Sequence, residues 1–366
     1  MEPHIPKKLP IGNLDWVEFV SVIGKANYNL AHYDGMLRGM PNPVLLSAPL
    51  SAQEAVMSSR IEGTQVSLQD VYEYQASPVE RERASSAAQD TKEIVNHIEA
   101  TSYAWKHIAG GKPISLNLIK EIHFILCDSV RGRDKARGEF RREQNYIAPI
   151  GTPFEKATYA PPPPEIVMDL LSNLEYYIHS EERDKLVQLA IVHAQFEIIH
   201  PFLDGNGRVG RILVPLFLLE NQLLSYPVFY ISAYFEENRE EYYHYLNRIT
   251  TDGEWNEWVK FFLNAVIHQS QSNANKVQDI INLYNDIKQK LMEALNSQYI
   301  IPTLDTIFAR PLFSTPEFVR ASSIPRPSVP RILSNLAKHD ILTIRRKGVG
   351  GRATIWELKP LMDILR

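Results

Sequence analysis

The stretch from His200 to Arg211 gathers residue types that together could bind and transfer a phosphate-containing group. It reads His-Pro-Phe-Leu-Asp-Gly-Asn-Gly-Arg-Val-Gly-Arg. An imidazole titrates near neutral pH and can act as a base. Arginines bind phosphate oxygens in bidentate fashion, and a carboxylate can share a Mg²⁺ ion with phosphates. The combination predicts a site that holds a nucleoside triphosphate and passes part of it to a hydroxyl.

Two helices are predicted to position this stretch. Lys185–Ile199 carries apolar residues at helical spacing. Pro201 cannot continue that helix, because it lacks an amide hydrogen and disfavours helical geometry in the residue before it. His200 is therefore expected at a helix end, facing a cleft. Val209–Leu219 then restarts an apolar helical pattern.

The turn between these helices is predicted to bind an anion. Gly205 and Gly207 flank Asn206 and permit backbone angles that other residues avoid. A glycine-rich turn at a helix N-terminus presents unpaired amide hydrogens, and the helix dipole adds to the attraction. Arg208 and Arg211 lie three residues apart, hence on one face of the second helix. Both guanidinium groups are expected at one phosphate site.

The whole stretch resembles the signature of the Fic (filamentation induced by cAMP) family, His-Pro-Phe-x-(Asp/Glu)-Gly-Asn-Gly-Arg-x-x-Arg, at every fixed position. Most such proteins transfer AMP from ATP to a Ser, Thr or Tyr hydroxyl of a target protein. The resemblance implies that His200 is the base, Phe202 the anchor of the loop and Asp204 the Mg²⁺ ligand. It also implies that ATP is bound by Gly205, Asn206, Gly207, Arg208 and Arg211.

A second segment suggests how such an activity could be held down. Residues 58–63 read Ser-Ser-Arg-Ile-Glu-Gly and are similar to the inhibitory helix of many Fic proteins, (Ser/Thr)-x-x-x-Glu-(Gly/Asn). Ala52–Ile61 is predicted to be helical, with Gly63 as the C′ residue. The resemblance implies that Ser58 belongs to this helix and that Glu62 pairs with Arg211, which withholds the arginine from the γ-phosphate. The alternative is an ordinary helix end.

A third segment predicts a hairpin over the site. In 137–165, Gln144–Ile150 is extended in character, residues 151–153 form a turn, and Pro161–Pro164 must be extended. The resemblance makes this the flap that registers a target segment by strand addition, with Ile147 and Ala148 lining the cleft. The alternative is a surface hairpin.

The resemblance also places Tyr242 and Tyr243, on a predicted helix, near the adenine base. Aromatic residues on a helix are otherwise mostly core.

The chain as a whole has the composition of an ordinary globular protein. It has 366 residues, 44% of them hydrophobic, and a formal net charge of −4. A single cysteine, Cys127, leaves no intrachain disulfide, sits in an apolar helical stretch and fits a reducing cytoplasm. The start lacks an apolar leader region, and the longest apolar run is too short to cross a bilayer. We expect a cytoplasmic protein with no membrane partner.

Four regions are expected along this mainly α chain. They are an N-terminal helical region with the inhibitory helix (1–110), a Fic-type helical bundle with a β-hairpin flap (111–268), a helical connector (269–300) and a small winged helix-turn-helix (301–366). Within the first region, residues 1–49 are expected to be a proline-containing arm with one helix near 27–37. The polar stretch 265–299 is interpreted as a connector, with a self-association seam, and hence a homodimer, as the alternative.

The last region has the order of elements of a winged helix. Thr315–Arg320 and Val329–His339 are predicted helices, and Leu342–Arg346 and Ala353–Leu358 are predicted strands. Between Arg320 and Arg352 there are eight Lys or Arg residues and one acid. This clustering favours contact with a phosphate backbone, so DNA is a candidate partner. Winged helices also serve as protein-interaction modules.

Three functions remain open from the sequence. The first is an autoinhibited protein adenylyltransferase that uses ATP and Mg²⁺ and modifies a hydroxyl of another protein or of itself; the same site could also remove AMP. The second is a DNA-binding regulator with a nucleotide-sensing site. The third is a metal hydrolase with His193, His200 and Asp204 as ligands, disfavoured because the motif supplies more phosphate-binding than metal-binding groups.

Overall fold

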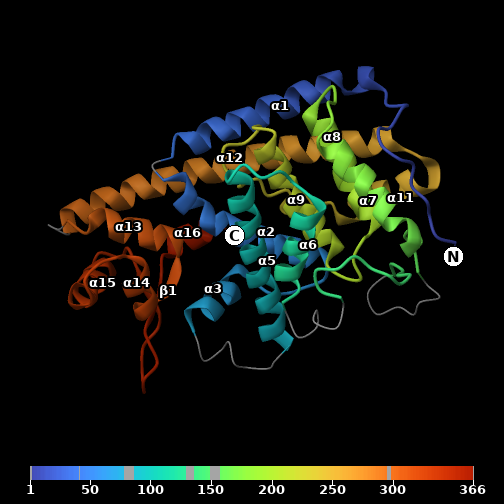
Figure 1. The fold of residues 1–366 in the computed structure, drawn as a ribbon. Coiled ribbons are helices and arrows are strands. Elements are labelled where there is room, and N and C mark those ends of the chain that lie inside the picture. Colours follow the sequence, from blue (N-terminus) through green and yellow to red (C-terminus); the bar gives the residue numbers. More distant parts are fainter. Residues whose placement is uncertain are drawn as a thin grey trace.

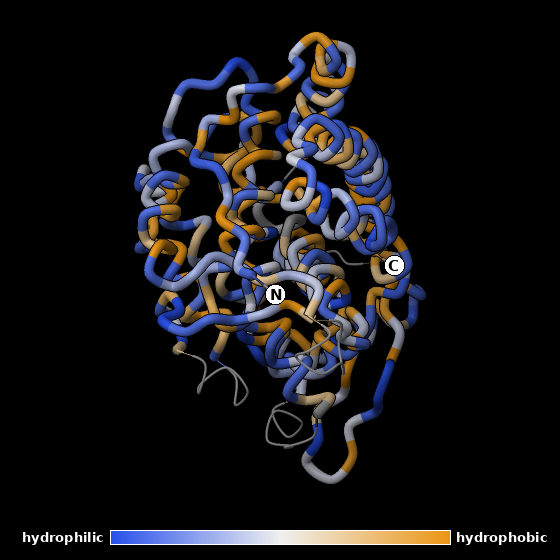
Figure 2. The backbone as a smooth tube through the Cα atoms, turned by 90° about the vertical axis from the view of Figure 1, so that its right-hand side faces the viewer, coloured by the Kyte–Doolittle hydropathy of each residue, from blue (hydrophilic) through white to orange (hydrophobic). Residues whose placement is uncertain are grey.

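Helices make up most of the chain, which confirms the predicted mainly α fold class. The computed structural model describes residues 2–40, 42–77, 86–128, 136–148, 157–294 and 298–365. The long helices α1 (Trp16–Arg38) and α12 (Trp255–Ala294) lie side by side along one flank of the molecule (Figure 1). Hydrophobic stretches gather in the interior of the helical body (Figure 2).

The N-terminal region is more helical than the sequence suggested. Helix α1 begins at Trp16, where the Asp15 side chain accepts hydrogen bonds from two main-chain amides. Helix α2 (Pro43–Ile61) includes Pro49, so the expectation of an arm reaching residue 49 was wrong. Pro43 stands in the first turn, where a missing amide hydrogen costs nothing. Packing of α2 against α10 and α13 supports the helix through Pro49.

Helix α3 (Leu68–Ala76) follows α2 and starts with a capping box between Ser67 and Asp70. Next come α5 (Ser86–Ala109), α6 (Leu116–Leu126) and α7 (Pro164–Ile178). Of these, α5 and α6 pack against α9, and α7 packs against α8.

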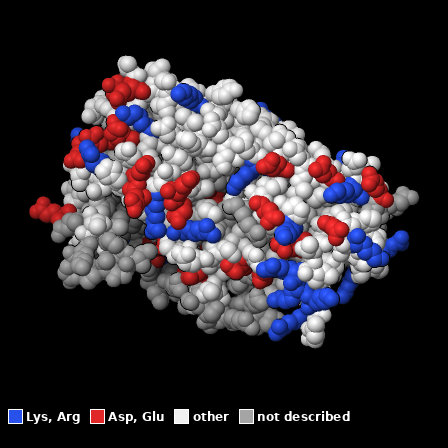
Figure 3. Space-filling model, turned by 180° about the vertical axis from the view of Figure 1, so that it is seen from behind, with Lys and Arg blue, Asp and Glu red and all other residues white. Residues whose placement is uncertain are grey.

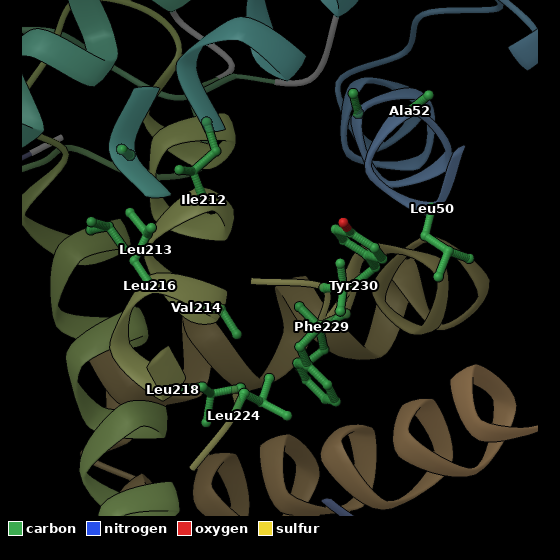
Figure 4. Close-up of a cluster of buried hydrophobic side chains, with 14 of the residues drawn as sticks. Leu50, Ala52, Ile212, Leu213, Val214, Leu216, Leu218, Leu224, Phe229 and Tyr230 are labelled. Atoms are coloured by element: carbon green, nitrogen blue, oxygen red, sulfur yellow. The ribbon is translucent and has the colours of Figure 1, made fainter. Parts of the chain in front are cut away.

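Helices α8 (Lys185–Ile199) and α9 (Asn206–Glu220) form the centre of the bundle and confirm the predicted pair of helices around the motif. Nearly every residue of α8 is buried, and the Trp258 Nε1 donates a hydrogen bond of 2.8 Å to the Ala190 carbonyl. In Figure 4, Val214 of α9 points toward Phe229, and Phe229 and Tyr230 lie between α9 and Leu50 of α2. The motif loop is therefore held between two helices, α8 and α9, that are fixed by their packing in the core.

Helices α10 (Ser232–Glu237) and α11 (Arg239–Asp252) lead into α12. Helix α12 runs without interruption through the expected boundary at residue 268, so the bundle and the connector share one helix. Beyond that boundary its apolar positions, Val277, Ile280, Ile287 and Leu291, are buried. The connector is thus part of the packed molecule.

The C-terminal region packs against the N-terminal one. It consists of α13 (Ile300–Ala309), β1 (Leu312–Ser314), α14 (Thr315–Ala321), the 3₁₀ turn η2 (Arg326–Ser328), α15 (Val329–Lys338), β2 (Thr343–Arg346), β3 (Ile355–Glu357) and α16 (Lys359–Ile364). The strands form an antiparallel sheet in the order β1-β3-β2. The two helices and two strands predicted after residue 314 are confirmed, while α13, β1 and α16 were not foreseen.

Contacts join this region to the rest of the chain. Helix α13 packs on α2, and β1 packs on α3. Across the described ranges, no helix is both long enough and apolar enough to cross a membrane.

Candidate active site

His200 stands at the end of α8 in an unusual backbone conformation. Its φ of 49° and ψ of 60° are left-handed, and its amide donates a hydrogen bond of 3.0 Å to the Phe196 carbonyl. The ring Nδ1 lies 3.3 Å from the Glu197 carbonyl, which assigns Nδ1 as the donor and leaves Nε2 as the acceptor. Burial lowers the pKa of His200 to about 4, so the ring is neutral at physiological pH.

The loop after His200 is closed by its own side chains. Phe202 is fully buried and stacks on His123, with ring centroids 3.8 Å apart. The Asn206 amide group makes hydrogen bonds of 2.8 Å to both the amide and the carbonyl of Phe202. Gly205 has a φ of 76°, a backbone angle that would be strained in a residue with a side chain. Phe202 is thus the anchor that was expected, and the Asn206 side chain holds the loop closed at the border of the polar hollow.

Arg211 is buried and bound by the end of α2. Its Nε donates to the Ser58 hydroxyl at 2.8 Å, and one terminal nitrogen donates to the Ser58 carbonyl at 3.0 Å. That same nitrogen lies 2.7 Å from Glu62 Oε1. Burial by itself would raise the pKa of the Glu62 carboxyl, but the Arg211 charge and hydrogen bond outweigh it and lower that pKa. The pair of residues that the sequence singled out is therefore in contact and charged.

Glu62 also lies at the N-terminus of α9. An ideal Cβ built on Gly207 would come within 2.5 Å of Glu62 Oε1, so glycine at this position makes room for the carboxylate. The N-terminus of a helix attracts anions through its free amides and its dipole. The Glu62 carboxylate thus lies where the sequence predicts a phosphate. Gly63, with a φ of 93°, follows α2 as the expected C′ residue.

Arg208 has different partners. Its guanidinium lies 3.2 Å from Glu93 of α5 and 3.7 Å from Asp204, and its side chain is 10% exposed. Glu93 was not found from the sequence, because it lies more than a hundred residues away on a helix with no distinctive pattern. Each motif arginine thus has a carboxylate partner from the N-terminal region.

Two hollows meet at His200. One, of about 400 Å³, is polar and is lined by Asp204, Arg208, Glu93 and Ala148 among others. The second, of about 430 Å³, is more apolar and is lined by Arg211, Glu197, Tyr242 and Tyr243 among others. Both are bordered by Glu62, Ile147, His200 and Gly207. Together they have the size and polarity of a site for a nucleoside joined to a charged tail.

Asp204 fits a metal ion only in company with other ligands. Its side chain is 40% exposed, and Oδ1 accepts a hydrogen bond of 2.7 Å from the Gly205 amide. Among the described residues, no cluster of three or more His, Cys, Asp or Glu side chains could hold a metal. Mg²⁺ commonly takes one or two carboxylates with phosphate oxygens. Asp204 is therefore suited to Mg²⁺ that arrives with a nucleotide.

The other candidate metal ligand, His193, is packed into the core. Its Nδ1 lies 3.2 Å from the Gly210 carbonyl, and its Nε2 lies 3.1 Å from the Tyr242 hydroxyl. Burial lowers the pKa of His193 to about 3. Both ring nitrogens have partners away from Asp204, so the structure does not bring His193, His200 and Asp204 together as ligands.

The two tyrosines of α11 border the apolar hollow unequally. Tyr242 is fully buried and packs among aromatic rings, with its ring centroid 4.5 Å from that of Phe235. Tyr243 is 44% exposed. Burial, followed by the charge of Glu62, raises the pKa of Tyr243 to about 12. Tyr243 can offer a ring face to a ligand, whereas Tyr242 supports the wall.

The described part of the predicted flap forms one antiparallel bridge, between Ile147 and Tyr159. The Ile147 amide donates to the Tyr159 carbonyl at 2.9 Å. Ile147 borders both hollows, and Ala148 borders the polar one. The turn predicted at residues 151–153, together with Ile150, lies outside the described residues.

Two further residues of the site were missed. Glu197 lies one helical turn before His200, a spacing that could have revealed it. Burial raises the pKa of the Glu197 carboxyl to about 7. Arg141 is buried beside the end of α8, and no local pattern distinguishes it. Cys127, from the apolar stretch noted in the sequence, is buried.

Known families match this chain in the regions that build the site. The description "Fic/DOC family N-terminal" matches residues 20–106, and "Fic/DOC family" matches residues 113–218. The chain belongs to the Fic/DOC family. The first match contains Glu62 and Glu93, and the second contains the whole motif.

Curated relatives resemble parts of the chain. A stretch of 70 residues is 46% identical to a probable protein adenylyltransferase of Aquifex aeolicus, covering 19% of this chain and 22% of that protein. Over 186 residues the chain is 30% identical to the protein adenylyltransferase Fic of Drosophila grimshawi, covering 48% of this chain and 34% of that protein. The chain spans about a third or less of the length of these relatives.

Solved structures share the fold. A Fic family protein from Desulfovibrio desulfuricans G20 superposes with a TM-score of 0.57 over 98% of both chains, at 17% identity. Fic-1 of C. elegans gives a TM-score of 0.55 over 73% of this chain and 74% of that one, at 18% identity. At these identities the likeness shows the fold.

Proposed function

We propose that this protein is a protein adenylyltransferase, which transfers AMP from ATP to a hydroxyl of a protein side chain. The carrying observation is that a neutral imidazole, a helix N-terminus and two arginines converge on one pair of hollows. The names of the curated relatives agree with this function. Asp204 would hold Mg²⁺, which when bound offsets the charge of the phosphates.

In the proposed transfer, His200 acts on the acceptor hydroxyl, and the bound ATP supplies the AMP. His200 Nε2 accepts the proton of the acceptor hydroxyl while the hydroxyl oxygen attacks the α-phosphorus. The bond from the α-phosphorus to the bridging oxygen breaks, and pyrophosphate leaves. Because the chain forms no covalent bond with the nucleotide, positioning and charge stabilisation account for most of its contribution. A pKa of about 4 keeps His200 ready to accept a proton at neutral pH.

Glu62 holds the enzyme in an inhibited state. It takes both the Arg211 guanidinium and the place beside Gly207 at the start of α9. A triphosphate in the productive position would need the same two features. Ser58 adds to the hold on Arg211, so release requires movement at the end of α2.

The experiment uses the Glu62→Gly variant, because glycine removes the carboxylate. After incubation with ATP and Mg²⁺, intact-mass spectrometry should show a gain equal to AMP on the protein. The gain should be larger than in the unsubstituted protein, and absent when the ATP is omitted. An Arg–phosphate contact is worth about 1.5–3 kcal/mol, so labelling should rise by roughly ten- to a hundredfold.

Two results would contradict parts of this function. Release of phosphate without any gain in protein mass would point to hydrolysis and against AMP transfer. Labelling that stays equal in the Glu62→Gly and unsubstituted proteins would argue against inhibition by Glu62. Loss of AMP from already labelled protein, seen with Glu62 present and absent without it, would favour AMP removal by the same site.

The C-terminal region is a winged helix that contacts DNA, in a cell compartment that keeps Cys127 reduced. The supporting observation is a gathering of exposed basic side chains at this end of the molecule (Figure 3). All but the half-buried Arg346 are exposed among the eight basic residues, which are Arg320, Arg326, Arg331, Lys338, Arg345, Arg346, Lys347 and Arg352. Binding to a fluorescent DNA duplex should weaken steeply as salt is raised. Absence of binding at low salt would leave protein contact as the role of this region.

A further inference from the structure

Arg141 is a buried cation that bonds to main-chain carbonyls of three segments. The residue as a whole is only 3% exposed to solvent. Nε donates to the His200 carbonyl at 2.9 Å, and one terminal nitrogen donates to the Pro162 carbonyl at 2.5 Å and the Ile199 carbonyl at 3.4 Å. The second terminal nitrogen donates to the Glu143 carbonyl at 3.3 Å, and the Arg141 amide donates to the Pro201 carbonyl at 2.9 Å.

These partners belong to two functional parts of the site. Ile199 and His200 end α8, where free carbonyls and the helix dipole favour a cation. Glu143 and Pro162 lie at the two ends of the flap, on either side of the bridge between Ile147 and Tyr159. One guanidinium therefore joins both limbs of the flap to the residue that carries the base.

Neutral side chains add to this junction without replacing it. The Tyr159 hydroxyl donates to the Ile198 carbonyl at 2.9 Å, and the Asn145 amide donates to the Phe202 carbonyl at 3.0 Å. The Gln144 amide donates to the Pro161 carbonyl at 2.9 Å, within the flap itself. The first two ties each join one limb to the region around His200, and the third joins the limbs only to each other, whereas Arg141 reaches both limbs and His200.

We propose that Arg141 is a positioning residue that fixes the flap relative to His200, and so sets where an acceptor hydroxyl meets the base. This inference rests on the proposed function, because the flap matters only if it carries an acceptor segment. Main-chain pairing to a flap can hold a segment no more firmly than the flap itself is held. A misplacement of about 1 Å between reacting groups can cost on the order of a hundredfold in rate.

The test compares Arg141→Met and Arg141→Lys in the Glu62→Gly protein, with Arg142→Met as the matched control. Arg142 is the exposed neighbour of Arg141, so its replacement by Met removes the same charge from the same segment. The labelling rate is measured against ATP concentration. We expect kcat to fall by roughly ten- to a hundredfold in Arg141→Met, with the KM for ATP within about twofold. Arg141→Lys should lie between, and Arg142→Met should match the parent.

A second readout needs no activity. Hydrogen exchange at the amides of Ile147 and Tyr159 should become faster in Arg141→Met and not in Arg142→Met, while exchange in the middle of α8 stays slow. If Arg141→Met does not fold, which would show as fast exchange throughout α8, Arg141→Lys carries the same comparison.

The outcomes separate the two proposals. If the Glu62→Gly parent transfers no AMP, the proposed function fails, and hydrogen exchange still decides the role of Arg141. If the parent transfers AMP and Arg141→Met equals it in kcat, or raises only the KM for ATP, the positioning role is wrong. Unchanged exchange at Ile147 and Tyr159 would also overturn it.

Discussion

The arginines that follow the motif loop are buried, whereas most basic side chains of the C-terminal region are exposed. In the loop, Arg211 is fully buried and held by three hydrogen bonds, and Arg208 is nearly buried between two carboxylates. In the C-terminal region, most of the basic side chains, such as Lys347 and Arg352, are exposed. Buried charges must be paired, so each partner in the loop is specified by the fold. Exposed charges are solvated and leave their partner open.

The same comparison applies to structure. The C-terminal region is not an appendage, because α13 packs on α2 and its apolar residues Leu304, Ile307 and Phe308 are buried. Two of its arginines also face α3: Arg345 lies 3.5 Å from Glu73, and Arg346 donates to the Ser77 hydroxyl. Removing the region would therefore uncover α2, the helix that ends just before Glu62. Surface charges are the better place to test its role.

The largest effect is expected at His200. In the Glu62→Gly protein, His200→Ala should lower AMP labelling by about a hundred- to ten-thousandfold, because it removes the base. Binding of ATP, measured by calorimetry, should stay nearly unchanged. In the protein with Glu62 and His200 the ring becomes protonated as the pH falls through about 4. Because the Glu62 charge raises this pKa, labelling by the Glu62→Gly protein that retains His200 should be lost at a still lower pH. Transfer that persists in His200→Ala would show that another group is the base.

An intermediate effect is expected at Glu93. Glu93→Gln keeps the size of the side chain but removes the charge that faces Arg208 at 3.2 Å. A hydrogen bond to a charged group contributes about 1.5–3 kcal/mol, so the melting temperature should fall by a few degrees. Glu99→Gln, on the exposed side of the same helix, serves as the control. A melting temperature equal to that of the control would mean that Arg208 does not depend on Glu93.

The smallest effect on catalysis is expected in the C-terminal region. Replacing Lys347 and Arg352 together by Gln should leave AMP labelling of the Glu62→Gly protein within about twofold. It should weaken DNA binding and lower the slope of log affinity against log salt by about two. A large loss of labelling would mean that catalysis depends on exposed charges of the C-terminal region as well as on the buried charges of the motif. An unchanged salt slope would exclude these two side chains from the DNA contact.

Much of the local structure was predictable because it depends on neighbouring residues. Apolar spacing and Pro201 placed α8 and its end, and the glycines placed the turn before α9. The contact between Glu62 and Arg211 was expected from a resemblance, and its geometry was not. The path of α2 through Pro49 was missed, because packing against α10 and α13 outweighs the local preference of proline.

The sequence by itself determined the chemical groups of the site and their order, since the motif and its two helices are local patterns. Only the tertiary structure decided which distant side chains meet them. It brought Glu93 to Arg208, Ser58 to Arg211, and Arg141 to the end of α8 and both limbs of the flap. The reason is physical: buried charges and free carbonyls require partners, but many residues could serve. Packing of the whole bundle selects among them.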